Sequence, residues 1–162
     1  MEKSSQKEFH SIKRLSKNYI GLTAEKTINV VSCNTGKEVF VSDKLSNMSQ
    51  SIYNQETKKL LVYNTSGYAY LYQLPDGKRL LPKIYLKQSD IWSEQIIWEG
   101  DFCWYPSFRK GIYRLNTRTG EVVVCIPSSR QSKKYKIFVL PGVYGATFLC
   151  RQSLLFMKFH WC

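Results

Sequence analysis

Residues that commonly build catalytic and metal sites are scarce in this sequence. Histidine occurs only twice in 162 residues, as His10 and His160, both near the ends of the sequence. His160 and Cys162 offer two metal ligands close together, but a structural zinc site takes four. We find no set of residues that predicts catalysis, and we expect no metal ion and no cofactor.

Paired cysteines are also lacking. The five cysteines are odd in number and widely spaced, and no Cys-x-x-Cys pair occurs among positions 33, 103, 125, 150 and 162. This spacing excludes a disulfide framework and a cysteine-based zinc site. We expect buried free thiols in a reducing compartment.

Long hydrophobic runs are absent. The opening residues, MEKSSQKEFHSIKRLSKN, lack the apolar core of a signal peptide. The most apolar stretch, residues 137–159, is interrupted by Pro141, Gly142, Arg151 and Lys158 and falls short of a membrane span. The sequence therefore predicts a cytoplasmic protein that does not enter a membrane.

Acidic residues are few, which leaves a strongly basic chain. There are 24 Lys and Arg against 12 Asp and Glu, and the net charge is +12. Residues 122–162 contain no acidic residue at all. A basic excess can attract nucleic acid, but no basic run exceeds two residues, so a solvated surface is the main interpretation.

What the sequence does contain is a repeat. Related segments, NTGKEVF, PDGKRLL and RTGEVVV, place Gly36, Gly77 and Gly120 at intervals of 41 and 43 residues. Each glycine is preceded by an apolar segment and followed by one or two charged residues and then an apolar pair. A period near 40 residues built from short strands is typical of propeller blades.

Further strands lie upstream of each glycine. One block is NYIGL at 18–22, KLLVYN at 59–64 and DFCWYP at 101–106, and another is QSIYN at 50–54 and EQIIW at 94–98. The first copy of that second block is weak, and we assign it to EFHSI at 8–12. Four short strands per unit predict a four-stranded antiparallel blade. The glycines are expected at hairpin turns that need positive φ, with Asn116 and Thr119 capping the third turn.

The segment IYRLNTRTGEVVV resembles the blade signature of bacterial β-propeller repeat proteins of the quinoprotein-like, YVTN-like and WD-repeat-like kind. The resemblance covers residues 9–126 and points to no specific member. Where the quinoprotein-type pattern has a docking tryptophan, four residues after the glycine, this chain has Phe40, Leu81 and Val124. The resemblance therefore implies the fold and gives no support for a bound quinone.

We therefore expect an all-β fold, a partial β-propeller of three to four four-stranded antiparallel blades with a period of about 41–43 residues. Residues 1–162 form one domain, with blades at roughly 9–43, 48–86 and 94–127 and an incomplete fourth at 133–162. Because propellers close with four to eight blades, such a chain leaves open sheet edges. This predicts a truncated fragment of a larger propeller, or a chain that self-associates.

The function that this fold favours is a binding or scaffold module with a protein or peptide partner, and not an enzyme. Four loop residues combine aromatic rings with cations and are the candidate partner contacts: Trp92, Phe108, Arg109 and Lys110.

Two alternatives remain. One is a fragment of a propeller enzyme, a quinoprotein-type oxidoreductase or a hydrolase that uses carboxylates of the segment SDIWSEQIIWEGD at 89–101. The other is non-specific nucleic-acid binding through the basic surface.

Overall fold

The computed structural model describes residues 8–47, 49–87, 89, 91, 95–107 and 111–127, together with the backbone of three later strands. The described chain is organised as four antiparallel sheets that follow one another in sequence. The first sheet consists of β1 (Ser11–Arg14), β2 (Tyr19–Thr23), β3 (Ile28–Ser32) and β4 (Glu38–Val41). The second consists of β5 (Ser49–Asn54), β6 (Lys59–Asn64), β7 (Tyr68–Gln73), β8 (Lys78–Arg79) and β9 (Ile84–Tyr85).

The third sheet consists of β10 (Ile97–Glu99), β11 (Phe102–Ser107), β12 (Gly111–Asn116) and β13 (Val122–Pro127). The fourth consists of β14 (Lys136–Phe138), β15 (Gly145–Cys150) and β16 (Ser153–Lys158). The expected all-β fold and the antiparallel sheets of a partial propeller are confirmed. The second sheet has five strands where four were expected, because β8 and β9 both pair with β7, at opposite ends of that strand.

The weak first strand lies later than expected. We assigned it to residues 8–12, whereas β1 is Ser11–Arg14 and is exposed along its whole length. Its pairing with β2 begins at Ser11 opposite Thr23, and His10 adds one backbone hydrogen bond to Thr23. Since β2 ends at Thr23, earlier residues have no further strand to pair with.

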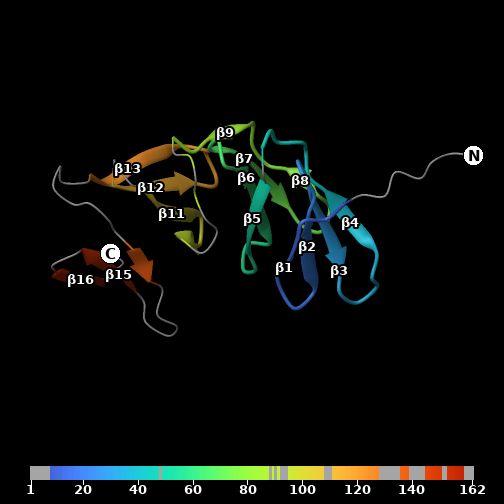
Figure 1. Cartoon of the computed structure of the whole chain (residues 1–162), viewed down its shortest axis with the longest axis horizontal. Coiled ribbons are helices and arrows are strands. Elements are labelled where there is room, and N and C mark those ends of the chain that lie inside the picture. Colours follow the sequence, from blue (N-terminus) through green and yellow to red (C-terminus); the bar gives the residue numbers. More distant parts are fainter. Residues whose placement is uncertain are drawn as a thin grey trace, which may run out of the picture.

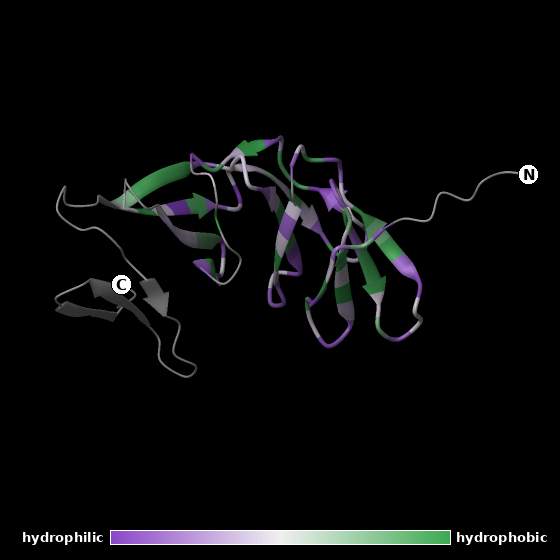
Figure 2. Ribbon diagram, viewed as in Figure 1, coloured by the Kyte–Doolittle hydropathy of each residue, from purple (hydrophilic) through white to green (hydrophobic). Residues whose placement is uncertain are grey.

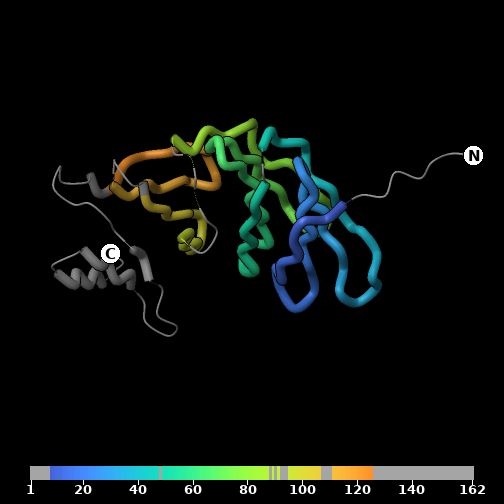
Figure 3. The backbone as a smooth tube through the Cα atoms, in the orientation of Figure 1, coloured from blue at the N-terminus to red at the C-terminus, as the bar shows by residue number. Residues whose placement is uncertain are grey.

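The sheets are arranged in chain order along an open arch, with β1–β4 at one end and β15 and β16 at the other (Figure 1). The backbone trace shows successive up-and-down strands within each of the first three sheets (Figure 3). This is the meander of propeller blades, in which each sheet packs its faces against its neighbours in the sequence.

Two hydrophobic cores fill the spaces between the first three sheets. The core between the first and second sheets contains Ile28, Val30, Leu60, Val62 and Tyr72, all 2% exposed or less. The core between the second and third sheets is formed by a larger set: Leu61, Tyr63, Ala69, Leu71, Ile84, Leu86, Ile91, Ile96, Cys103, Tyr105, Tyr113, Leu115 and Val122. Figure 2 shows hydrophobic residues along the strands and hydrophilic residues in many of the connecting turns.

The repeated glycines stand at the expected turns. Gly36, Gly77 and Gly120 have φ of 67°, 66° and 78°, a conformation that glycine adopts without strain. In the third turn Asn116 Oδ1 accepts hydrogen bonds from the backbone amides of Arg118 (2.9 Å) and Thr119 (3.4 Å). The glycine spacing therefore marks the hairpin between the third and fourth strands of each of the first three sheets.

The expectation that the free thiols are buried is wrong for one of them. Cys103 is buried, but Cys33 is exposed, because it lies in the turn between β3 and β4 and not within a strand. Among the described residues, no helix has the length and apolar character that crossing a bilayer requires.

Candidate protein-contact surface

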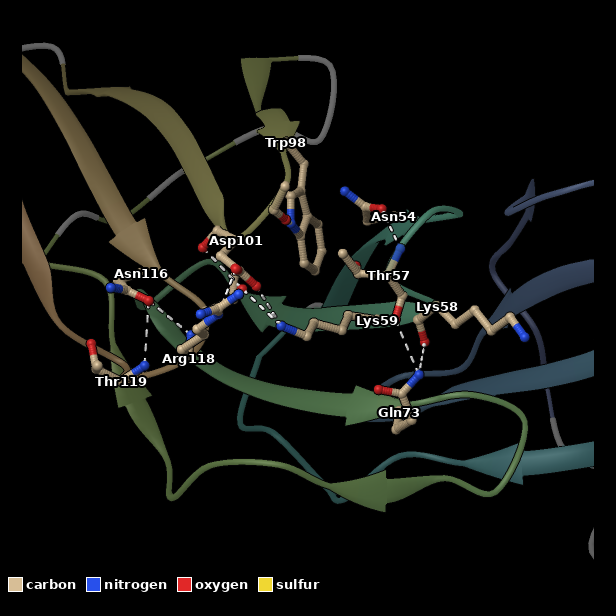
Figure 4. A network of polar contacts seen from close by, with 12 residues as sticks. Asn54, Thr57, Lys58, Lys59, Gln73, Trp98, Asp101, Asn116, Arg118 and Thr119 are labelled. Carbon is tan, nitrogen blue, oxygen red and sulfur yellow. Dashed lines mark hydrogen bonds and ion pairs between the residues drawn. The ribbon is translucent and has the colours of Figure 1, made fainter. Parts of the chain in front are cut away.

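Two of the polar or aromatic clusters in the described chain bear on function. The first is the Asp101 node, which joins the second and third sheets and consists of Lys59, Asp101, Thr117 and Arg118 (Figure 4). Lys59 comes from β6, Asp101 from the turn between β10 and β11, and the other two from the turn between β12 and β13. Lys59, at the start of β6, reaches both of these turns.

The contacts in the Asp101 node are short and partly buried. Lys59 Nζ donates to Asp101 Oδ1 at 3.0 Å and to Thr117 Oγ1 at 3.3 Å, and Arg118 Nε lies 2.5 Å from Asp101 Oδ2. The Asp101 carbonyl accepts from the backbone amide and the hydroxyl of Thr117 at 2.8 and 3.0 Å. The hydrogen bond from Lys59 lowers the pKa of the Asp101 carboxyl, against a smaller opposing effect of burial.

This geometry gives Asp101 a structural role. Both of its carboxylate oxygens are engaged by cations, and the ionised form is favoured, so the group is poorly suited to donate a proton. Nearby polar groups also serve turns: Trp98 Nε1 donates to the Gly100 carbonyl and Gln73 Nε2 to the Lys58 carbonyl (Figure 4). We conclude that the node fixes the second sheet against the third.

The second cluster lies on the surface of the second sheet and is called here the tyrosine patch: Tyr68, Tyr85 and Lys83. Tyr68 in β7 is paired directly with Tyr85 in β9, and the next pair, Ala69 and Ile84, is buried in the core. Successive strand residues point to opposite faces, so the buried pair turns both tyrosines outward. Tyr68 is 38% exposed and Tyr85 is 56% exposed.

The rings of the tyrosine patch are held in place before any partner binds. The ring centroids of Tyr68 and Tyr85 are 5.2 Å apart, and Lys83 Nζ lies 4.4 Å from the Tyr68 ring centroid. The backbone beneath is fixed by a 2.7 Å hydrogen bond from the Leu86 amide to the Gly67 carbonyl. Ordered, exposed tyrosines beside a cation are typical of residues that contribute strongly to protein interfaces.

The sequence did not identify the tyrosine patch. The alternation YAYLY at 68–72 predicts three tyrosines on one face, but only their packing separates exposed Tyr68 from buried Tyr72. The contacts proposed from sequence, Trp92, Phe108, Arg109 and Lys110, lie outside the described residues. Tyr63 and Tyr105 are buried in the core.

Potential metal ligands do not gather in the described part of the chain, where no group of three or more His, Cys, Asp or Glu side chains converges. His10 lies just before β1, and His160 is outside the described residues.

Comparison with solved structures identifies the fold. The computationally designed Ika4 protein matches with a TM-score of 0.67 and 13% identity, over 98% of this chain and 95% of that chain. Sqt1 of Saccharomyces cerevisiae matches with a TM-score of 0.64 and 11% identity, over 95% of this chain and 46% of its own. The β-propeller domain of Cps50 (Swd1) from Myceliophteria thermophila matches with a TM-score of 0.61 and 11% identity, over 96% and 55%.

These likenesses show a β-propeller fold. The chain spans about half the length of the Sqt1 and Cps50 chains that it matches. No protein-family model matches the sequence, and no curated protein matches it.

Proposed function

We propose that this chain is a β-propeller binding module that engages a protein or peptide partner through the tyrosine patch. The observation that carries the proposal is the exposed, preordered pair of Tyr68 and Tyr85 with the Lys83 ammonium beside it. Rings that are already ordered lose less conformational freedom on binding, which raises their contribution to affinity.

The chemistry of the tyrosine patch indicates which kind of partner it would bind. The two rings offer an apolar surface, while the exposed Lys83 supplies a positive charge at its edge. A segment that carries an aromatic or aliphatic side chain next to a carboxylate would match both features. The net charge of +12 favours such an acidic partner over a basic one.

Three parts of this proposal extend beyond the patch. Trp92, Phe108, Arg109 and Lys110 remain candidate contact residues on the strength of their sequence alone. A cytoplasmic location remains a proposal, supported by a cysteine spacing that offers no disulfide framework. A quinoprotein-like type of repeat remains a proposal, supported by the positions of Phe40 and Leu81 beside Gly77 and Gly120 of the following sheets.

The test is a pull-down from native cells with the tagged chain and two variants. We expect a specific partner to be recovered by the wild type and by Val124→Ala, which truncates an exposed side chain of the third sheet. The double variant Tyr68→Ala/Tyr85→Ala should lose that partner while melting at a similar temperature. Recovery of no specific partner by the wild type would overturn the proposed function, and retention by the double variant would overturn the assigned surface.

The dependence of affinity on salt concentration distinguishes nucleic-acid binding from binding to a protein partner. If phosphates were the ligand, log affinity for duplex DNA would fall by about 0.9 per log unit of salt for each phosphate contacted. Binding to the acidic partner should instead depend on the two tyrosines and weaken only modestly with salt.

A further inference from the structure

The backbone that carries Tyr85 is held by a side chain of the third sheet. Tyr105 Oη donates a hydrogen bond of 2.8 Å to the carbonyl of Leu86, the residue that follows Tyr85. Tyr105 lies in β11, and both it and Leu86 are 1% exposed. This buried hydrogen bond therefore ties the third sheet to the segment that bears half of the tyrosine patch.

The position of Leu86 explains why this hydrogen bond orients the neighbouring ring. Leu86 lies just past the end of β9, where strand pairing stops at Tyr85, and its amide donates to the Gly67 carbonyl at 2.7 Å. On the other side of Tyr85, Ile84 is 5% exposed and pairs with Ala69. Because both neighbours of Tyr85 are buried, fixing the Leu86 backbone directs the Tyr85 ring outward.

Tyr68 is held in a similar way by Asn64, which ends β6 and is 1% exposed. Asn64 Oδ1 accepts a hydrogen bond from the Tyr68 amide at 2.9 Å, and Asn64 Nδ2 donates to the Ser46 carbonyl. The Asn64 carbonyl also accepts from the Gly67 amide at 3.0 Å. One buried carboxamide thus connects the start of β7 with the segment that joins the first and second sheets.

The hydroxyl of Tyr105 and the carboxamide of Asn64 are not needed to fill space. The Tyr105 ring stacks on Tyr113 with centroids 5.8 Å apart, and a phenylalanine ring would occupy the same volume. Burying a polar group costs free energy unless it is hydrogen-bonded. Burial raises the pKa of Tyr105, so its hydroxyl stays protonated and remains a donor. Both polar groups bond backbone atoms that adjoin Tyr85 or belong to Tyr68.

We propose that Tyr105 and Asn64 are positioning residues for the tyrosine patch, which hold Tyr85 and Tyr68 in the orientation that a partner binds. The inference rests on the proposed function for the role of the patch, whereas the order of the two rings is a property of the chain alone. Both residues are buried, so they act on the partner through the two exposed rings. Rigid support of this kind raises affinity, because less freedom is lost on binding.

The test compares two tyrosine-to-phenylalanine variants of the 162-residue chain by NMR. Tyr105→Phe removes the positioning hydroxyl, and Tyr113→Phe makes the same change in the stacked ring, whose hydroxyl has no described hydrogen bond to the patch. The rings of Tyr68 and Tyr85, with centroids 5.2 Å apart, should give strong mutual NOEs in the wild type. These NOEs should persist in Tyr113→Phe and weaken in Tyr105→Phe.

The melting temperature separates positioning from a general loss of packing. One lost hydrogen bond should lower the melting temperature of Tyr105→Phe by no more than about 4 °C. Unchanged ring NOEs in Tyr105→Phe would overturn its role. Equal weakening in Tyr105→Phe and Tyr113→Phe would overturn it as well, because that result indicates a loosened core and not a specific contact.

Hydrogen exchange of the Tyr68 amide tests the role of Asn64. Asn64→Ala should make this amide exchange faster, whereas Ser46→Ala retains the carbonyl that Asn64 bonds and should leave the exchange rate unchanged. A Tyr68 amide that stays protected in Asn64→Ala would contradict the assignment. If Asn64→Ala does not fold, the wild type decides instead, and exchange at the rate of unstructured backbone would contradict the assignment.

Partner recovery links the ring order to function. In the pull-down, Tyr105→Phe should recover less of the partner than Tyr113→Phe. Equal recovery despite weakened ring NOEs would show that ring order does not control affinity and would overturn the positioning role. Recovery of no partner by the wild type would overturn the proposed function, whereas the NOEs would still decide whether Tyr105 holds the rings.

Discussion

Phe40 of the first sheet lies directly against Gly77 of the second. A Cβ at Gly77 would stand 2.3 Å from Phe40 Cδ2 and 2.9 Å from Cε2, and the φ of Gly77 is +66°. Phe40 also contacts Tyr72, with ring centroids 4.7 Å apart. The glycine therefore serves both a turn and a close contact between two sheets.

This relationship predicts different costs for the same substitution at two turns. Gly77→Ala should lower the free energy of unfolding by about 3 kcal/mol, from a strained backbone and a displaced Phe40 ring. Gly36→Ala has a similar φ of +67° but nothing within 4 Å, so its cost should be about 1 kcal/mol, from the backbone alone. Urea unfolding of both variants measures the difference. Equal losses would show that the Phe40 contact contributes nothing.

The Asp101 node should couple the second sheet to the third. Lys59→Met removes a side chain that is 14% exposed and should lower the free energy of unfolding by about 2 kcal/mol, because Asp101 stays partly buried without its main partner. Arg118 is 76% exposed, so Arg118→Met should cost about 0.5 kcal/mol or less. A double-mutant cycle of Lys59→Met with Asp101→Asn measures the coupling, and additive losses would contradict it.

Acid should weaken the same node. The hydrogen bond from Lys59 holds the pKa of Asp101 below its ordinary 3.8, so the folded state binds this proton less readily than the unfolded state. The stabilisation by the carboxylate is therefore complete above the unfolded pKa and is lost as the pH falls through the folded pKa. The stability difference between wild type and Asp101→Asn should shrink below pH 3.8 in unfolding titrations. A difference that stays constant with pH would argue against the contact.

The thiols should differ sharply in reactivity. Burial raises the pKa of the Cys103 thiol well above its ordinary value, and the side chain lies in the core between the second and third sheets. Iodoacetamide at neutral pH should modify exposed Cys33 quickly and Cys103 only when the chain unfolds. Peptide mapping by mass spectrometry reads each site separately. Early modification of Cys103 in the native protein would show that the second core opens locally.

Local turn chemistry made much of the fold predictable. Gly36, Gly77 and Gly120 each lie at a hairpin turn that requires positive φ, and such a turn is recognisable from a few adjacent residues. The position four residues after the glycine was also recognisable: Phe40 lies against Gly77, and Leu81 lies 3.6 Å from where a Cβ at Gly120 would stand. The period and the strand type therefore follow from sequence.

Packing between sheets could not be predicted in the same way. Tyr68 and Tyr72 belong to one alternating segment and one strand face, yet they are 38% and 2% exposed. Tyr72 is covered by Phe40, which is 32 residues away, and Asp101 meets Lys59 across 42 residues. Such contacts depend on how far one sheet extends over the next, which no local pattern encodes.

Strand β6 separates the two hydrophobic cores and contributes side chains to both, so it should not tolerate an insertion. Leu60 and Val62 enter the core with the first sheet, while Leu61 and Tyr63 enter the core with the third. Because side chains alternate along a strand, one added residue early in β6 would exchange the two sets. Both cores would then receive side chains of the wrong size and shape at once. A single-residue insertion in β6 should therefore abolish cooperative folding across three sheets, whereas one in a hairpin turn should leave both cores intact.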